Sequence, residues 1–237
     1  MRRAALLVPV LSVILACGSR TAEPPPAQAA KPAPSVTAPT TPATPAPTPP
    51  AAPKRPDTTG WQTFEGPDGK IGFKDAGGKI VLPARYATAD GFSPAGVACV
   101  ADDVGWTCID GSGAEVLKPY LFDNGPDPFS DGLARFVEDG KVGFYDDKFT
   151  KVIPARYAFA EPFADGRAPF CTGCTRSCDG EHCSMTGGKW GLLDKAGVEV
   201  VAPRFDRISG FEDGKARALE GGAERTIDPQ GNAVAGG

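Results

Sequence analysis

The chain has 237 residues, a formal net charge of −4 and 41% hydrophobic residues. This composition suits a protein with a folded core, and the negative charge argues against nucleic acid and against a basic membrane-binding surface. The single His leaves no Ser-His-Asp arrangement, and neither a Walker A nor a G-x-G-x-x-G motif occurs. We therefore expect no catalysis and no cofactor.

Residues 1–16 have the pattern of an export signal, with "MRR" before an apolar run that is too short to span a bilayer. The run ends in "ILAC", which resembles the bacterial lipobox. That resemblance implies that Cys17 becomes the lipidated N-terminus and anchors the protein in a membrane. Gly18, where Asp would imply inner-membrane retention, points to the outer membrane. The alternative is an ordinary secretory signal with an incidental Cys.

Residues 17–58 are expected to form a tether between this anchor and a folded domain. They are rich in Pro, Ala and Thr, and no Phe, Trp or Tyr occurs before Trp61. Such a segment cannot bury enough apolar area to offset its ordering entropy, and its Pro content favours an extended spacer. A PxxP ligand for another protein is the alternative.

Residues 59–237 hold all the aromatic side chains and contain an internal repeat with four full and two partial copies. An Asp opens a four-residue turn in each copy, followed by a short strand that ends near an aromatic residue expected in the core. A Phe-x-x-Gly motif then precedes a third strand, and its Gly is expected to have a positive φ. The Asp residues are Asp75, Asp110, Asp146, Asp194 and Asp228, and the aromatic residues are Tyr86, Phe122, Tyr157 and Phe205.

The turn Asp, the core aromatic residue and the Phe of the third motif recur in the same order in each full copy. This predicts an all-β fold of tandem three-stranded β-repeats. The partial copies at the two ends together make one more unit. The repeats could close into a propeller-like ring or stack as an open array capped by these end strands. The third turn, "DDKF", lacks the Gly of the others, so we predict a different turn there.

The segment "GKWGLLDKAGVEVVAPRFD" resembles the WG-containing repeat family, whose unit begins with Trp-Gly. The fourth copy carries nearly the whole pattern, at Trp190, Gly191, Asp194, Gly197, Pro203, Phe205, Phe211, Gly214 and Ala216. The other copies depart from it, with Ile71-Gly72, Trp106-Thr107 and Val142-Gly143 in place of Trp-Gly. The resemblance implies a bacterial cell-envelope repeat protein that binds rather than catalyses.

Six cysteines remain if Cys17 carries lipid, an even number that suits disulfides in an oxidising compartment. Cys99 and Cys108 flank a two-residue loop at Asp103 and Val104. They should therefore lie opposite each other, in a non-hydrogen-bonded pair that suits a cross-strand disulfide.

The insertion at residues 171–187 holds Cys171, Cys174, Cys178 and Cys183, with His182 beside the last. We expect two disulfides that staple the loop, pairing Cys171 with Cys183 and Cys174 with Cys178. The alternative is a Zn site made by the four thiolates, with His182 as a competing ligand. A redox function at "CTGC" is a third reading, although no βαβ pattern surrounds it.

We expect a monomeric outer-membrane lipoprotein that displays its repeat domain for binding or scaffolding at the cell envelope. Its partner would be an envelope protein or a glycan, and the membrane is contacted through the lipid. The alternative function is metal binding or redox sensing by the insertion. Trp190 and Trp106 could stack on a sugar, but their equivalent strand positions favour core packing.

Overall fold

The computed structural model describes residues 54–180 and 182–235, which contain strands, turns and loops but no helix. All of them belong to one structural unit, Pro42–Gly237. The described residues accordingly contain no helix long and apolar enough to cross a membrane. Cys17 and most of the expected tether lie outside the described residues.

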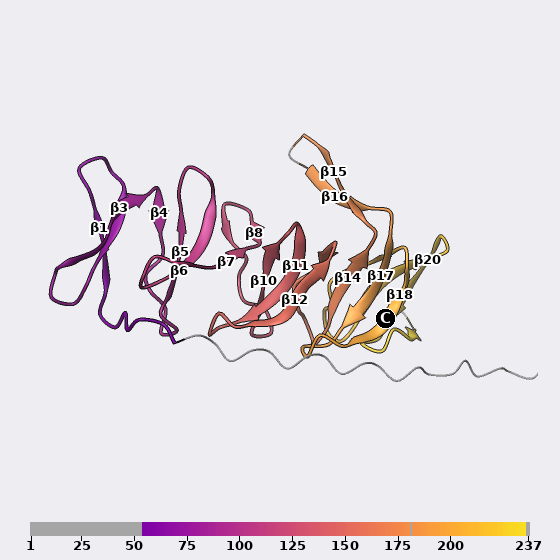
Figure 1. The fold of residues 1–237 in the computed structure, drawn as a ribbon. Coiled ribbons are helices and arrows are strands. Elements are labelled where there is room, and N and C mark those ends of the chain that lie inside the picture. Colours follow the sequence, from indigo (N-terminus) through magenta and orange to yellow (C-terminus); the bar gives the residue numbers. More distant parts are fainter. Residues whose placement is uncertain (1–53, 181, 236–237) are drawn as a thin grey trace, which may run out of the picture. The chain divides into compact units, whose positions relative to one another are not determined.

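Five antiparallel three-stranded units follow one another in chain order (Figure 1), and a short pairing of β7 with β10 joins the second and third of them. We call them the first to the fifth sheet. They consist of β1 (Gln62–Glu65), β2 (Ile71–Lys74) and β3 (Ile80–Tyr86); β5 (Val97–Ala101), β6 (Trp106–Asp110) and β7 (Glu115–Pro119); β10 (Leu133–Glu138), β11 (Lys141–Asp146) and β12 (Lys151–Tyr157); β14 (Ala168–Thr172), β17 (Lys189–Leu193) and β18 (Glu199–Phe205); and β20 (Ala216–Glu220), β21 (Ala223–Ile227) and β22 (Ala233–Val234).

Short strands connect neighbouring sheets. Where the second strand of a repeat ends, the chain crosses over and pairs with the third strand of the same repeat, which belongs to the next sheet. These connecting strands are β4 (Thr88–Ala89) on β5, β13 (Phe159–Ala160) on β14 and β19 (Arg207–Ile208) on β20. The second repeat instead forms a separate pair, β8 (Leu121–Phe122) with β9 (Gly125–Pro126).

Each sheet is out of phase with the sequence repeat. It combines the third strand of one copy with the first two strands of the next, as β1 pairs with β2 and β20 with β21. The two partial copies thereby complete the first and the fifth sheets. Within the described ranges no ladder joins β1 to the fifth sheet, so the arrangement is the open array of the two predicted alternatives.

Polar residues stand on the outer faces of both end sheets. The residue directly before each turn Asp is buried in the four later sheets, as Ile109, Tyr145, Leu193 and Ile227, but is Lys74 in the first sheet. The residue two before each turn Asp is buried in the first four sheets, as Phe73, Cys108, Phe144 and Leu192, but is Thr226 in the fifth. These substitutions cap the array, since an apolar outer face would be exposed to water.

The turn Asp residues act identically in all five sheets. In the fourth sheet the Asp194 carboxylate accepts the backbone N–H groups of Ala196 and Val198 at 3.0 and 2.9 Å. The other four turns have the same hydrogen bonds, from the N–H groups two and four residues after the Asp, at Asp75, Asp110, Asp146 and Asp228. An Asp carboxylate thus replaces the backbone partners that a tight turn leaves unpaired.

The prediction of a different third turn was wrong. Phe149 adopts a φ of 57° where the other turns have Gly, and its N–H still donates to the Asp146 carbonyl at 2.8 Å. Its ring stacks on Tyr145 with centroids 5.3 Å apart. Aromatic packing therefore offsets the cost of a left-handed backbone at a residue with a Cβ. The Gly of each of the three Phe-x-x-Gly motifs has the positive φ expected, between 70° and 81°.

The core consists of four apolar clusters, and each lies between two consecutive sheets. Tyr86, Tyr157 and Phe205 belong to it as predicted, with exposed fractions of at most 2%. Because each sheet buries its faces only against its neighbours, the stability of the domain is a sum of nearest-neighbour contacts.

Tyr145 lies in the core between the second and third sheets, where burial and the nearby Asp127 carboxylate raise its pKa to about 12. The unfolded pKa is about 10, so the stability contributed by the neutral phenol is complete below pH ~10 and is lost as the pH rises through about 12. We expect Tyr145→Phe to show a smaller alkaline loss of unfolding free energy, measured by urea unfolding at several pH values. Parallel pH profiles for the variant and the parent would contradict this.

Candidate binding groove beneath a disulfide-stapled arm

Cys99 and Cys108 form the disulfide expected from the sequence. They lie directly opposite each other in β5 and β6, with Cα atoms 3.9 Å apart. Both side chains are buried in the core between the second and third sheets. This disulfide therefore ties one hairpin of the second sheet and leaves no thiol for other chemistry.

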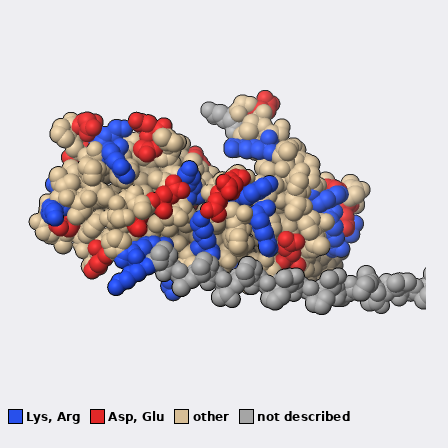
Figure 2. All heavy atoms as spheres, viewed as in Figure 1, with Lys and Arg blue, Asp and Glu red and all other residues tan. Residues whose placement is uncertain are grey.

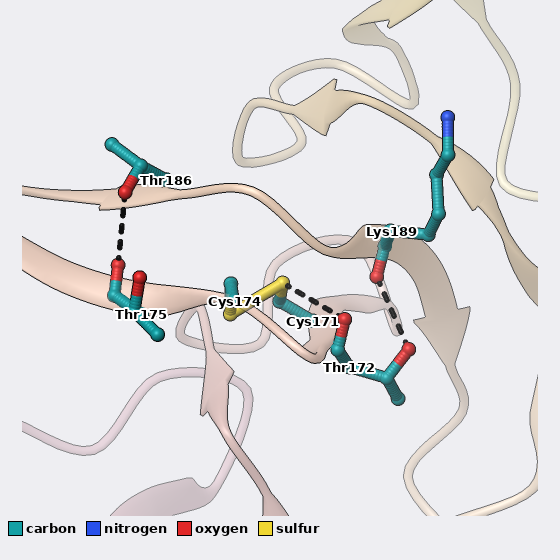
Figure 3. Close-up of a disulfide and its surroundings, with 6 residues drawn as sticks. All are labelled: Cys171, Thr172, Cys174, Thr175, Thr186 and Lys189. Atoms are coloured by element: carbon teal, nitrogen blue, oxygen red, sulfur yellow. Dashed lines mark hydrogen bonds between the residues drawn. A yellow bond between two sulfur atoms is a disulfide. The ribbon is translucent and has the colours of Figure 1, made fainter.

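The insertion forms a two-stranded hairpin, β15 (Thr175–Asp179) with β16 (His182–Thr186), which we call the arm. Its cysteines are paired differently from our expectation. Cys178 bonds to Cys183, its direct partner across the hairpin, and Cys171 bonds to Cys174 at the base (Figure 3). The expected Cys171–Cys183 pair is wrong because Cys171 lies within the main sheet, opposite Trp190 of β17.

The alternative Zn site is not assembled in this structure. The Cys171–Cys174 pair is buried at the base of the arm, whereas Cys183 of the other pair is exposed. Among the described side chains, no three His, Cys, Asp or Glu residues converge on one point. The side chain of His182 lies outside the described residues.

The arm projects away from the sheets (Figure 1). All five β15 residues are exposed, and in the described structure β15 and β16 pair only with each other. An isolated two-stranded hairpin is marginally stable in water. Two disulfides compensate for the missing third strand: Cys178–Cys183 joins the two strands near the tip, and Cys171–Cys174 links the base of the arm to β14.

The array is irregular in the second repeat, and Phe122 there is not a core residue as predicted. Its side chain is 64% exposed, because the chain leaves β6 after Leu117, and Lys118 and Pro119 pair with β10 instead. Trp106 therefore lacks the second-strand partner that Trp190 has in Phe205. The aromatic side chain comes one residue later after the turn Asp than in the other copies, which is the sequence signal for this change.

A groove lies between this irregular region and the arm. Its wide part, of about 950 Å³, is lined by Trp106, Leu121, Val104 and Lys118 among others. Its narrow part, of about 240 Å³, passes under the arm between Met185 and Trp190. Tyr120 and Arg176 line both parts, so the two parts adjoin each other. Figure 2 shows a basic side chain on the arm above a hollow in the surface.

A ladder of aromatic rings forms the groove floor. Phe159 meets Tyr120 on one side and Trp190 on the other, with centroids 6.1 and 5.9 Å apart. The Arg135 guanidinium covers the Tyr120 ring at 4.1 Å and donates two hydrogen bonds to the Asp127 carboxylate, at 2.7 and 2.8 Å. Both side chains of this ion pair are at most 4% exposed. The floor is therefore held rigidly from below.

Three charged side chains face the narrow part of the groove, Glu161, Arg176 and Arg207. Partial burial raises the pKa of the Glu161 carboxyl, and the charges of Arg135 and Arg207 oppose this shift. In the described residues neither Arg176 nor Arg207 has a carboxylate within 4.0 Å. None of these residues was singled out by the sequence, since Glu161 and Arg176 come from the third repeat and Arg207 from the fourth.

The comparison with protein families concerns the repeats that build this site. Four segments match the model of the WG containing repeat, residues 71–103, 106–141, 143–173 and 190–222, which together exceed half of the chain. The protein belongs to the WG-containing repeat family. No curated protein matches the chain.

The structure explains the Gly of the WG repeat. A Cβ at Gly191 would lie 2.4 Å from the Val201 carbonyl oxygen and 2.8 Å from the Phe170 ring. Gly72 and Gly143 are equally confined between a bulge of the second strand and a Phe of the third strand. The second WG repeat has Thr107 instead, and Val100 replaces the Phe opposite it. The Gly of the repeat signature is therefore required because the backbones of the first and second strands lie too close together for a side chain.

The two Trp residues of the WG repeats differ in exposure. Trp190 is 4% exposed and packs in the core between the fourth and fifth sheets. Trp106 is only partly buried and lines the groove. Core packing, which the sequence favours for both rings, is confirmed for Trp190 but not for Trp106, because the second strand covers only Trp190.

Proposed function

We propose that this WG-repeat protein is a non-catalytic binding protein of the cell envelope that presents its groove to a partner. The observation that carries this proposal is the break in the second repeat. Val104, Leu121 and Phe122 are 94, 46 and 64% exposed beside the wide part of the groove. Gathered apolar side chains on the surface of a soluble domain mark an interaction site.

The proposal includes an anchor in the outer membrane through lipid on Cys17, with residues 17–58 as the tether. The signal pattern at residues 1–16 supports it. Export would also bring the cysteines into an oxidising compartment, which agrees with the three disulfides. The net charge of −4 favours an envelope protein or glycan over nucleic acid as the partner.

The contacts of residues 54–60, which we call the strap, support presentation of the groove at the opposite ends of the repeated strands from the strap. Arg55 donates to the carbonyls of Lys148 and Phe149 in the third Asp turn, at 2.8 and 3.1 Å. The arm is inserted between β14 and β17, at the opposite end of β17 from its own Asp turn. The strap and the arm therefore contact opposite ends of the repeated strands.

A photo-crosslinking amino acid at Phe122 tests this function in intact cells. We expect one discrete crosslinked product from this position. The same amino acid at Ala76, an exposed residue of the first Asp turn, is the matched control and should give none. Absence of a product at Phe122, or the same product from both positions, would contradict a partner bound in the groove.

The anchor is tested by Cys17→Ser. Loss of the thiol prevents lipidation, so the protein should move from the membrane fraction to the soluble envelope fraction, followed by immunoblotting of fractionated cells. Residue 17 lies outside the described domain, so the crosslink at Phe122 tests partner binding independently of the anchor. Retention of the variant in the outer membrane would show that the lipid is not the anchor.

A further inference from the structure

Resting on the proposed function, we infer that the groove binds an extended peptide segment of a partner protein in which a carboxylate side chain lies between apolar side chains. Three independent features of the groove carry this inference: the charge of its narrow part, the apolar surface of its wide part, and the free strand edges of the arm above it.

The charge of the narrow part favours an anion. Arg176 approaches from the arm and Arg207 from β19, and neither has a carboxylate partner within 4.0 Å among the described residues. Guanidinium groups bind carboxylates with paired hydrogen bonds. Glu161 opposes them only in part, since burial disfavours its charged form. A carboxylate of the partner would therefore complement this end of the groove.

The wide part favours apolar side chains. Leu121 and Val104 line it with the partly exposed Trp106, and Phe122 stands next to Leu121 in β8. A glycan would use the flat face of Trp106 but would leave the aliphatic Val104 and Leu121 in water. Leu, Phe or similar side chains of a peptide would cover both, with a gain proportional to the apolar area removed from water.

The arm offers a backbone template. In the described structure β15 and β16 form a two-stranded sheet, so each has one edge without a strand partner. Exposed edges bind extended segments by strand addition, in which the main chain supplies affinity and alternate side chains supply specificity. The disulfides Cys171–Cys174 and Cys178–Cys183 hold the arm in place before the partner arrives, which lowers the entropic cost of binding.

Peptide binding to the exported full chain carrying Cys17→Ser tests the inference by fluorescence anisotropy. The probe is a short labelled peptide that alternates Leu and Ser around a central pair of Glu residues. We expect saturable binding, and we expect the same peptide with Lys in place of Glu to bind at least about tenfold more weakly, the effect of losing one good ionic contact.

Charge reversal identifies the site. Arg176→Glu and Arg207→Glu replace exposed side chains, so both variants should fold, and each should weaken binding of the Glu peptide about tenfold. Lys195→Glu, at an exposed residue of the fourth Asp turn, is the matched control and should not change it. Equal loss in all three variants would show a general charge effect and overturn the site.

The glycan alternative is measured in the same assay. Binding of a soluble chitin oligosaccharide or peptidoglycan fragment, with no binding of the Glu peptide, would overturn the inference. A crosslinked product at Phe122 in cells would still support the proposed function in that case. If neither the crosslink nor peptide binding is found, the proposed function fails together with the inference.

Discussion

Gly143→Ala is expected to lower the free energy of unfolding by about 3 kcal/mol, or to prevent folding. An added Cβ would lie 2.5 Å from the Ile153 carbonyl oxygen and 2.6 Å from the Ala155 nitrogen and the Phe136 ring. Two of these three atoms belong to the backbone of the bulged strand and cannot rotate away. The small entropic gain of replacing Gly in the unfolded chain, about 0.4–1 kcal/mol, does not offset such a clash.

The loss is measured by urea unfolding of the exported, unlipidated chain. Gly91→Ala is the matched control, because a Cβ there would meet no atom within 4 Å and the residue does not have a positive φ. It should change stability by no more than about 1 kcal/mol. Equal stability of the two variants would show that the bulge yields, and the explanation of the WG glycine would be wrong.

Arg135→Leu is expected to cost about 3–5 kcal/mol, the second large effect. The change leaves the Asp127 carboxylate, 2% exposed, without its two guanidinium hydrogen bonds, and it removes the donor to the Ala160 carbonyl. A buried charge without a partner costs far more than the intact pair contributes. The double variant Arg135→Leu with Asp127→Leu should therefore lose less than the sum of the single variants.

The matched control for this prediction is the exposed ion pair between Lys70 and Asp103. The Asp103 side chain is 90% exposed, so Asp103→Ala should cost less than about 1 kcal/mol. Urea unfolding measures all four variants. A loss of under 1 kcal/mol for Arg135→Leu would mean that water reaches Asp127 once the guanidinium is gone, and that the groove floor is not rigid.

Much of the fold follows from local sequence. Each turn Asp accepts hydrogen bonds from backbone N–H groups that follow it within four residues. Asp75 to Asp228 therefore identify five turns without any knowledge of packing. Between the turns, the strands have either alternating apolar and polar residues or continuous apolar runs. These patterns predict an all-β repeat. The Cys99–Cys108 pair is equally local, because a two-residue loop sets the register of both strands.

Other features depend on contacts between repeats and could not be read from one unit. The choice of an open array rests on β1 pairing with β2, a matter of which sheet an end strand joins. The disulfide pairing in the insertion depends on the position of Cys171, which lies opposite Trp190 in the main sheet. Cys183 therefore bonds to Cys178. Phe149 keeps its turn because Tyr145 offers its ring a stacking surface.

The sequence by itself determined the repeat, its strands and turns, and the family to which the protein belongs, because each depends on residues within a few positions of one another. Only the tertiary structure decided where the candidate groove lies. Arg176, Tyr120 and Arg207 belong to three different repeats, and they meet because the second repeat leaves its regular path while an arm inserted in the third stands over the gap. Such a meeting is a property of packing between units, which no single unit encodes.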